Sequence, residues 1–317
     1  RIRAGLFAPT VSWRGRGGIA LITGGLGGLG IVSAEALAEA GVTCVVLASR
    51  SGRISRDGQG LEDRMRALAD SGATVIQEKC DTSVEQQVQG LLQRIRRLGS
   101  LRVVVHAAGI LDDKMIQRQT RESMRSSFAP KADGAWYLHK HTLQDPIESF
   151  VCYSSIAANY GFHGQANYAA SNTFMDELCR WRVSRGLPAV SVQWPGIKDV
   201  GMAASIVAQD IDLHHSVGPD TVKQVVRQVV AGAGPMEPVQ AVCPAGQMVP
   251  RMRQHAALME PLLQGMVQGM TVVGGEVRCR VSGTSHLVRL HASSKDASSS
   301  AVANVETSST PQQVEEA

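Results

Sequence analysis

The sequence predicts an α/β fold: a Rossmann-like, doubly wound parallel sheet that forms a single main domain with a disordered C-terminal tail. Short apolar runs alternate along the chain with segments of helical period, as they do in strand–helix–strand units. A glycine-rich turn follows the first apolar run and leads directly into the first helical segment. Hydrophobic residues make up 44% of the 317 residues, which is enough for a large packed core.

The composition argues against several classes of protein. The formal net charge of +4 gives no general argument for a nucleic-acid partner, and no apolar run reaches the length of a membrane span. We therefore expect no nucleic-acid partner and no membrane association. Because no targeting signal is visible, we expect a cytoplasmic location, or the plastid stroma in a eukaryote. No C-x-x-C pair occurs, so we expect buried free thiols and no metal site. The six cysteines are Cys44, Cys80, Cys152, Cys179, Cys243 and Cys279.

Composition also suggests how the chain is divided. The expected parts are residues 1–17, 18–250, 251–291 and 292–317. The first carries four arginines and no acid and is interpreted as a linker, whereas the second is the main domain; because the chain begins at Arg1, we expect a piece of a longer polypeptide. The third contains a helical pattern at 252–266 and a hairpin-like Gly274-Gly275 pair, and remains an uncertain extension. The last is rich in Ser, Ala, Thr, Gln and Glu, which is typical of a disordered linker.

The first predicted strand, residues 18–22, runs into a turn that matches two patterns for phosphate binding. The turn fits both G-x-G-x-x-G and T-G-x-x-x-G-x-G, and a helix over 31–40 follows it. In such a turn the glycines let the backbone approach a pyrophosphate at the N-terminus of the helix. An ordinary tight turn, the alternative interpretation, would not need glycines at all these positions between a strand and a helix. We therefore assign the whole turn to a dinucleotide site: Thr23, Gly24, Gly25, Leu26, Gly27, Gly28, Leu29 and Gly30.

The second predicted strand, residues 42–50, ends where a dinucleotide site contacts the adenosine ribose. A site for NAD usually has Asp or Glu at this point, but this strand ends in Ser49 and Arg50. A hydroxyl and a guanidinium suit a ribose 2′-phosphate, so the sequence favours NADPH over NADH. Asp81, at the end of a third strand over 73–81, is a candidate acceptor for the adenine amine.

Small side chains and one lysine mark the middle of the chain. The other elements predicted before residue 150 are helices over 61–71, 84–98, 121–128 and 130–139 and a strand over 101–109. That strand ends in Ala107, Ala108 and Gly109, whose small side chains let a cofactor lie close. Lys131, in the last of these helices, is the candidate cation of the site, although a lone lysine is ordinarily a surface residue.

Three polar side chains are predicted to converge at the end of a strand over 150–153. Ser155 lies at its C-terminal end, and Tyr168 and Asn172 lie four residues apart on one face of the following helix. A hydroxyl, a phenol and an amide placed together suit binding and protonating a carbonyl oxygen. A phenol is a poor acid at neutral pH unless a nearby cation stabilises its anion, so the chain must supply that cation.

The main domain is completed by three further elements. They are a strand over 188–196, a helix over 219–230 and a last strand over 239–243. Pro195 and Gly196, at the end of the first of these strands, are assigned to the cofactor site. Residues 200–217 have no strong period, which is typical of a lid over a binding site.

Between residues 18 and 249 the chain resembles the ketoreductase domain of modular polyketide synthases, within the short-chain dehydrogenase/reductase superfamily. The segments that carry the resemblance are Thr23 to Gly30, His106-Ala107-Ala108-Gly109, Pro130-Lys131-Ala132-Asp133-Gly134-Ala135, Ser154-Ser155, and Asn167-Tyr168 with Asn172. Free-standing reductases of the superfamily carry Tyr-x-x-x-Lys, whereas Asn172 stands at that lysine position here. Polyketide synthase ketoreductases place the lysine on the preceding helix, at the position of Lys131. The resemblance therefore implies a catalytic tetrad of Lys131, Ser155, Tyr168 and Asn172.

The resemblance also implies a reaction, which is reduction by NADPH of the β-carbonyl of an acyl chain thioesterified to an acyl carrier protein. Ser155 and Tyr168 would bind the carbonyl oxygen, and Tyr168 would protonate it. Lys131 would lower the pKa of the tyrosine and contact the nicotinamide ribose, and Asn172 would hold the lysine or a relay water. The implied partners are the acyl carrier protein and neighbouring domains of a synthase for polyketides or fatty-acid-like products.

Two details of the resemblance concern stereochemistry and architecture. Leu111, Asp112 and Asp113 look like the Leu-Asp-Asp signature of B-type ketoreductases, which form the D-configured 3-hydroxyl. The A-type marker is a Trp eight residues before the catalytic Tyr, where this chain has Tyr160. Such ketoreductases usually have a structural subdomain before the catalytic half; here only residues 1–17 precede this region, so that subdomain lies upstream or the architecture differs.

Two other functions remain open from the sequence. One is a free-standing reductase of small ketones or acyl-CoA, and the other is a non-catalytic structural domain of a synthase. The complete tetrad and the glycine turn argue against the second.

Overall fold

The computed structural model describes residues 18–54, 58–202, 216–231 and 237–242, together with the backbone of four strands after residue 266. The chain forms two units, one of residues 7–242 and one that combines residues 1–6 with 243–317. Among the described residues, no helix is long and apolar enough to cross a membrane.

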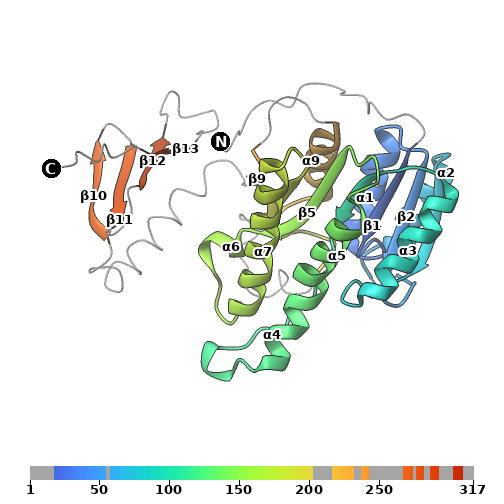
Figure 1. Ribbon diagram of the computed structural model, residues 1–317, viewed down its shortest axis with the longest axis horizontal. Helices are drawn as coiled ribbons and strands as arrows, with labels where there is room; N and C mark the ends of the chain where they lie inside the picture. Colours follow the sequence, from blue (N-terminus) through green and yellow to red (C-terminus); the bar gives the residue numbers. More distant parts are fainter. Residues whose placement is uncertain are drawn as a thin grey trace. The chain divides into compact units, whose positions relative to one another are not determined.

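The first unit is built on a seven-stranded sheet with the strand order β3-β2-β1-β4-β5-β6-β9 (Figure 1). The strands are β1 (Ile19–Thr23), β2 (Cys44–Ser49), β3 (Thr74–Lys79), β4 (Leu101–His106), β5 (Ser149–Ser155), β6 (Val190–Trp194) and β9 (Val239–Ala241). Every pairing in this sheet is parallel. The predicted Rossmann-like parallel sheet is confirmed.

Helices cover both faces of the sheet and bury its strands. The helices are α1 (Gly28–Glu39), α2 (Leu61–Asp70), α3 (Glu85–Leu98), α4 (Arg121–Phe128), α5 (Gly134–His141), α6 (Ala157–Tyr160), α7 (Ala166–Ser184) and α9 (Pro219–Ala231). One hydrophobic cluster joins alternate strand residues to α1, α2 and α9, and a second joins the remaining ones to α3, α5 and α7. Within β1, Ala20 and Ile22 belong to the first cluster, whereas Ile19 and Leu21 belong to the second. This alternation explains why central strands read as continuous apolar runs.

The strand order reverses between β1 and β4, and this reversal positions the site. The chain passes from β1 outward to β2 and β3, and then returns to β4 on the other side of β1. The helices that follow these two strands leave in opposite directions, so a crevice opens beyond their carboxyl ends. The glycine turn follows β1, and Ala107, Ala108 and Gly109 follow β4.

The predicted helices and strands are found with small shifts of their ends, but two local features differ. The helix expected over 130–139 is interrupted, because Ala129–Asp133 form a π-helical turn, η2, before α5 begins. The short helix α6 was not predicted, since four residues are too few to show a period. Of the expected lid, residues 203–215 lie outside the described residues, while Ser216–Val217 form β8 and pair with β7 (Gly196–Ile197).

The second unit contains an antiparallel sheet of β10 (Val267–Val273), β11 (Glu276–Val281), β12 (His286–Ala292) and β13 (Ala303–Ser309). β10 and β11 pair on either side of Gly274-Gly275, where the sequence predicts a hairpin. β13 lies within residues 292–317, for which the sequence predicts a disordered linker. An edge strand needs only backbone hydrogen bonds to its neighbour, here β12, and these leave no apolar period in the sequence. The helical pattern at 252–266 lies outside the described residues.

Candidate active site

The glycine turn between β1 and α1 is packed so closely that side chains would not fit at several of its positions. Gly24 has φ 67°, and a Cβ there would lie 2.7 Å from the carbonyl of Ala107. A Cβ on Gly30 would lie 2.4 Å from the carbonyl oxygen of Gly24. At Gly27, by contrast, the nearest atom to an added Cβ would be that same oxygen at 3.3 Å. A methyl group at Gly27 would therefore need a shift of only a few tenths of an ångström in that carbonyl oxygen.

The N-terminus of α1 is suited to an anionic group. No side chain caps it, and its first turn contains no acidic residue. The N–H groups of the first turn of any helix lack intrahelical acceptors, and the helix dipole adds positive potential there. The glycine turn and the start of α1 have room and positive potential for the pyrophosphate that the sequence predicts there. Leu26 is fully buried and Leu29 packs on Gly201, so these two residues would offer a cofactor their backbone.

The residues expected at the adenosine end lie at the ends of β2 and β3. The hydroxyl of Ser49 accepts a hydrogen bond from the N–H of Gly52 at 3.1 Å. Arg50 is exposed and has no ion pair within the described part of the chain. Asp81 Oδ1 accepts hydrogen bonds from the N–H and hydroxyl of Ser83, at 3.0 and 2.7 Å, which fixes its side chain.

The residues after β4 and β6 border the crevice. The N–H of Ala107 donates to the carbonyl of Thr23 at 3.0 Å, so this segment continues alongside the glycine turn, and Ala108 follows it. A Cβ on Gly109 would lie 2.9 Å from Cε of Lys131, so the absence of a side chain leaves room for the lysine. Pro195 is buried directly after β6, and Gly196 begins β7.

Lys131 belongs to the π-helical turn η2, and its side chain is buried, with 3% of the residue's surface exposed. Its ammonium donates to the carbonyl of Tyr153 at 2.8 Å and lies 5.2 Å from the centre of the Tyr168 ring. Burial lowers the pKa of Lys131 to about 8, although nearby Cys152 and Asp176 oppose this shift. The lysine therefore changes charge near neutral pH, which a surface lysine does not.

The turn that presents Lys131 is held by two side chains that the sequence gave no reason to single out. π-helical turns are rare and often occur at functional sites. The hydroxyl of Thr82 donates to the carbonyl of Pro130 at 3.1 Å, and Nε2 of His106 lies 2.9 Å from the carbonyl of Lys131. His106 was quoted within a motif but given no role, and hydrogen bonds between such distant positions leave no local pattern.

Tyr168 is 9% exposed at the start of α7. Burial raises its pKa to about 12, the charge of Asp113 raises it further, and hydrogen bonding by Asn172 and Ser155 opposes both. The raised pKa differs from the lowering expected from Lys131, because burial of the phenol is the largest effect on it. The phenol is therefore fully protonated at neutral pH and carries the proton that an acid must donate.

Asn172 and Ser155 complete the tetrad, which the fold brings together. Asn172 is fully buried, and its amide N–H donates to the carbonyl of Tyr168 at 2.8 Å. Since that carbonyl only accepts, Oδ1 of Asn172 points away, and it has no hydrogen-bond partner within the described residues. The hydroxyl of Ser155 accepts from the N–H of Ala157 at 3.1 Å, which leaves its own proton to donate.

The segment from Leu111 to Asp113 is hydrogen-bonded to the residues just before Tyr168. Asp113 accepts a hydrogen bond from the amide of Gln165 at 2.9 Å. The buried amide of Asn167 donates to the carbonyls of Asp112, at 2.8 Å, and Ser123, at 3.0 Å. The same side chain accepts from the N–H of Tyr168 at 2.8 Å, so Asn167 positions Tyr168, a role that its motif alone did not reveal.

The side chain of Asp112 is held on the α4 side of this segment. It accepts from the hydroxyl of Ser126 at 2.7 Å and pairs with Lys114 at 3.1 Å. Within the described residues, no group of three His, Cys, Asp or Glu side chains is placed to hold a metal ion.

A family model described as the KR domain matches residues 18–199. Among curated proteins, the chain is 40% identical over 191 residues to chalcone synthase cfoA of Aspergillus candidus, a match that covers 59% of this chain and 7% of that protein. It is 35% identical over 252 residues to polyketide synthase GfsB of Streptomyces halstedii, covering 78% of this chain and 4% of that protein. The chain thus spans a small fraction of the length of these relatives.

A solved structure entitled an A-type ketoreductase from a modular polyketide synthase superimposes with a TM-score of 0.67 and 29% identity. The superposition covers 77% of this chain and 51% of that one. A short-chain dehydrogenase/reductase from Mycobacterium ulcerans, at 21% identity and a TM-score of 0.64, shares the fold.

Proposed function

Because this chain belongs to the ketoreductase (KR) domain family of polyketide synthases, oxidoreductases of the short-chain dehydrogenase/reductase type that use a nicotinamide cofactor, we propose that it reduces β-ketoacyl thioesters. The substrate proposed is an acyl chain on an acyl carrier protein, and the product is the 3-hydroxyacyl thioester. The observation that supports this most is the buried ammonium of Lys131, 5.2 Å from the Tyr168 ring, with Asn172 one turn further along α7.

The cofactor proposed is NADPH. The bound nicotinamide would supply the hydride. The turn from Thr23 to Gly30 and the segment Ala107 to Gly109 would hold the cofactor, together with Pro195 and Gly196. Ser49 and the exposed Arg50 would bind a ribose 2′-phosphate, and Asp81 would accept from the adenine amine.

The proton is proposed to come from Tyr168. Its phenol is protonated at neutral pH and would donate to the carbonyl oxygen as negative charge develops there. The hydroxyl of Ser155 would donate a second hydrogen bond to the same oxygen. Below pH 8 the ammonium of Lys131 would stabilise the tyrosinate that remains, which is how the lysine would act despite the raised resting pKa of Tyr168.

Asn172 is proposed to hold the relay that returns a proton to the site. Its Oδ1 is buried without a partner in the described part of the chain, which is costly unless a donor fills the position. A water or the Lys131 ammonium would satisfy it.

The stereochemical proposal is a D-configured 3-hydroxyl, as in B-type ketoreductases. It rests on Leu111, Asp112 and Asp113, whose segment is fastened beside Tyr168 by Asn167. The A-type designation belongs to the similar solved structure and is not transferred to this chain.

The organisation proposed for the whole protein is a synthase in the cytoplasm, or the plastid stroma of a eukaryote. Residues 18–250 would form the catalytic domain, next to other synthase domains and a carrier domain. A reductase of small ketones or acyl-CoA and a non-catalytic structural domain are the alternatives.

The test is to incubate the chain with NADPH and acetoacetyl-N-acetylcysteamine, to follow absorbance of the reduced nicotinamide, and to resolve the product by chiral chromatography. We expect NADPH consumption and the D-3-hydroxy product. An L product would overturn the stereochemical proposal alone. Binding of NADPH without turnover would point to a missing structural half or carrier protein, whereas no binding at all would favour the structural domain. Faster reduction of simple ketones would favour the free-standing reductase.

A further inference from the structure

A cluster of exposed residues on η1 (Ile116–Arg118) and α4, together with the residue just before η1, is called here the α4 surface: Met115, Ile116, Arg118, Arg121 and Arg125. Ile116 is 66% exposed and Met115 is 52% exposed, although both are large apolar side chains. Among the exposed large apolar residues in the described part of the chain, Ile116 has the highest exposed fraction. Two neighbouring apolar side chains in water, rimmed by charges, are typical of a protein contact.

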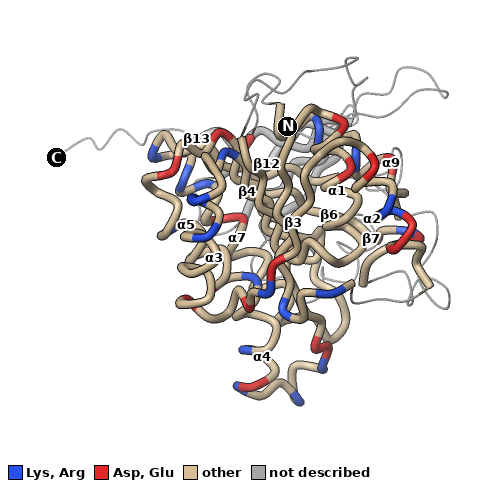
Figure 2. Tube along the Cα trace, turned by 90° about the vertical axis from the view of Figure 1, so that its right-hand side faces the viewer, with Lys and Arg blue, Asp and Glu red and all other residues tan. Residues whose placement is uncertain are grey.

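The charges of the α4 surface are unbalanced. Between Ile116 and Phe128 there are three arginines and one acid, Glu122. None of the three arginines forms an ion pair within the described residues, whereas Arg94, Arg96 and Arg102 elsewhere are paired with carboxylates. Figure 2 shows Lys and Arg positions around α4. Unpaired arginines on a projecting element attract an acidic partner and speed its encounter.

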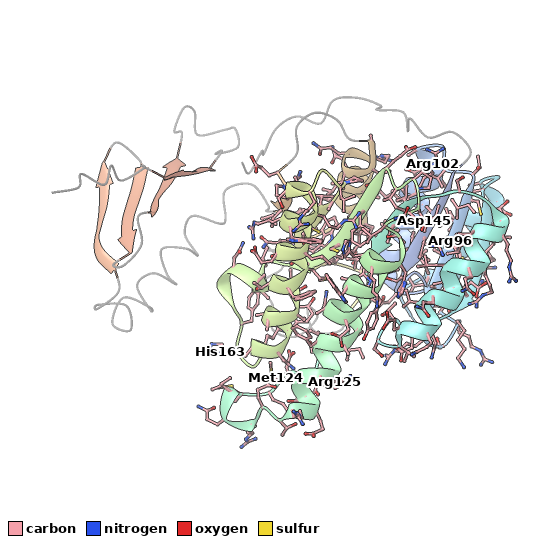
Figure 3. The ribbon with its side chains drawn as sticks, in the orientation of Figure 1. Arg96, Arg102, Met124, Arg125, Asp145 and His163 are labelled. Atoms are coloured by element: carbon pink, nitrogen blue, oxygen red, sulfur yellow. The ribbon has the colours of Figure 1, made fainter. Side chains whose placement is uncertain are left out.

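The α4 surface adjoins the catalytic tyrosine. The N–H of Lys114 donates to the carbonyl of Gly164 at 2.8 Å, and Asn167 bonds the carbonyl of Ser123 within α4 at 3.0 Å. Asn167 directly precedes Tyr168. In Figure 3, Met124 and Arg125 of α4 lie at the same end of the unit as His163, which precedes α7. A partner bound here would therefore stand beside the residue that protonates the substrate.

We propose that the α4 surface docks the acidic protein domain that presents the acyl chain, so that the chain enters next to Tyr168. This rests on the proposed function, because only a protein-tethered substrate requires a protein contact beside the site. Arg118, Arg121 and Arg125 steer the acidic face of that domain, and Met115 and Ile116 contact it once it is bound. Three cations on a chain of net charge +4 are too few to favour nucleic acid.

The experiment compares two substrates with the same acyl group: acetoacetyl-N-acetylcysteamine and acetoacetyl on the phosphopantetheine arm of a purified acidic acyl carrier protein. For the triple variant Arg118→Glu/Arg121→Glu/Arg125→Glu, we expect KM for the carrier-bound substrate to rise about tenfold, since each rim charge contributes modestly. We expect kcat/KM for the N-acetylcysteamine thioester to stay unchanged. In the unmodified chain, added salt should lower kcat/KM for the carrier-bound substrate only.

Two further variants make the result specific. Arg97, an exposed arginine on α3 without an ion pair in the described residues, is the control: Arg97→Glu makes one of the three charge reversals away from the α4 surface and should leave kcat/KM for both substrates unchanged. Met115→Ala/Ile116→Ala should raise KM for the carrier-bound substrate without changing its salt dependence. Because all these side chains are exposed, and Glu at position 121 suits the first turn of α4, the variants should fold.

The outcomes separate the two proposals. If the triple variant reduces both thioesters, and its KM for each equals that of the unmodified chain, the docking surface is overturned and the proposed function stands. A rise in KM for Arg97→Glu as large as that of the triple variant per reversed charge would show a general charge effect, which also overturns the docking surface. Reduction of neither thioester by the unmodified chain overturns the proposed function and, with it, the docking of an acyl-bearing partner.

Discussion

Nε2 of His106 donates a hydrogen bond to the backbone carbonyl of Lys131, at 2.9 Å. The carbonyl can only accept, so Nε2 carries the proton, and burial lowers the pKa of His106 to about 4, which keeps the ring neutral. Nδ1 then accepts from the hydroxyl of Thr23 at 2.7 Å. One buried ring thus connects the end of β1, where the glycine turn begins, to the turn that carries the lysine.

We expect His106→Leu to lower the free energy of unfolding by about 2–5 kcal/mol, because it leaves the Thr23 hydroxyl buried without a partner and leaves the Lys131 carbonyl with the N–H of Gly134 as its remaining donor. Urea denaturation measures the loss. Thr82→Val is the matched control on the same turn, since it removes only the hydrogen bond to the carbonyl of Pro130 and should cost about 1–3 kcal/mol. If His106→Leu cost no more than Thr82→Val, the connecting role of the ring would be wrong.

The sequence predicts much of this fold because a parallel sheet repeats one pattern. Two kinds of local signal were available: the apolar runs of β1, β2 and β4, and an apolar stripe on α3. All four residues of that stripe are buried: Val88, Leu91, Leu92 and Ile95. Ser155, Tyr168 and Asn172 were also accessible, because they follow a strand or share a helix face.

The positioning residues were not accessible from local patterns. Thr82, His106 and Asn167 act through hydrogen bonds to backbone carbonyls at least 25 residues away in sequence, and neither partner shows a period or a motif spacing. The π-helical turn at Lys131 receives two of these contacts, on the carbonyls of Pro130 and Lys131. Lys131 itself was assigned only through the resemblance, because nothing local distinguishes a buried lysine from an exposed one.

The charge of Lys131 should control activity near pH 8. Its ammonium is lost as pH rises through the lowered pKa of about 8, so kcat should fall over that range. Lys131→Met should lower kcat at pH 7 and should lack this limb of the profile. A profile for Lys131→Met that still fell through pH 8 would assign the limb to another group.

The same shift predicts an opposite trend in stability. The pKa of Lys131 is lowered in the folded protein, so between pH 8 and 10.5 the unfolded chain binds more protons than the folded one. Stability relative to Lys131→Met should therefore rise with pH across this window, by up to about 3 kcal/mol. Urea denaturation of both proteins at pH 7.5 and 10 measures the difference, and a fall in the relative stability of the unmodified chain would contradict the buried cation.

Tyr168→Phe should lower kcat by about 10²- to 10⁴-fold, since it removes the proposed acid, while NADPH affinity stays the same. The control is Tyr153→Phe, which makes the same change at a tyrosine of similar burial. The Tyr153 hydroxyl bonds Ser33 at 2.6 Å, so that variant should lose about 1 kcal/mol of stability and keep its kcat. Steady-state rates and urea denaturation separate the two, and full activity in Tyr168→Phe would disprove the assignment.

Arg50→Glu should reduce kcat/KM with NADPH by about 10²-fold and leave kcat/KM with NADH equal or higher, because a carboxylate repels a 2′-phosphate and accepts from a ribose hydroxyl. Arg50 is exposed without an ion pair in the described residues, so the fold should tolerate the change. Arg97→Glu serves as the control for a general effect of charge. An unchanged ratio between the two cofactors would remove Arg50 from the cofactor site.

Gly27 and Gly30 should separate cofactor binding from folding. A Cβ at position 27 meets only the carbonyl oxygen of Gly24, at 3.3 Å, whereas a Cβ at position 30 would lie within 2.4 Å of that oxygen and 2.5 Å of Cα of Gly25. Gly27→Ala should therefore unfold within a few degrees of the unmodified chain, but its Kd for NADPH should rise at least about tenfold, because the methyl group occupies the side where the pyrophosphate approaches. Gly30→Ala should lower Tm strongly, since backbone atoms must move to accept it.

Thermal unfolding with and without NADPH measures both effects, and NADPH should raise Tm of the unmodified chain but not that of Gly27→Ala. If Gly27→Ala bound NADPH normally, the pyrophosphate would lie elsewhere, and the assignment of the glycine turn would have to be withdrawn.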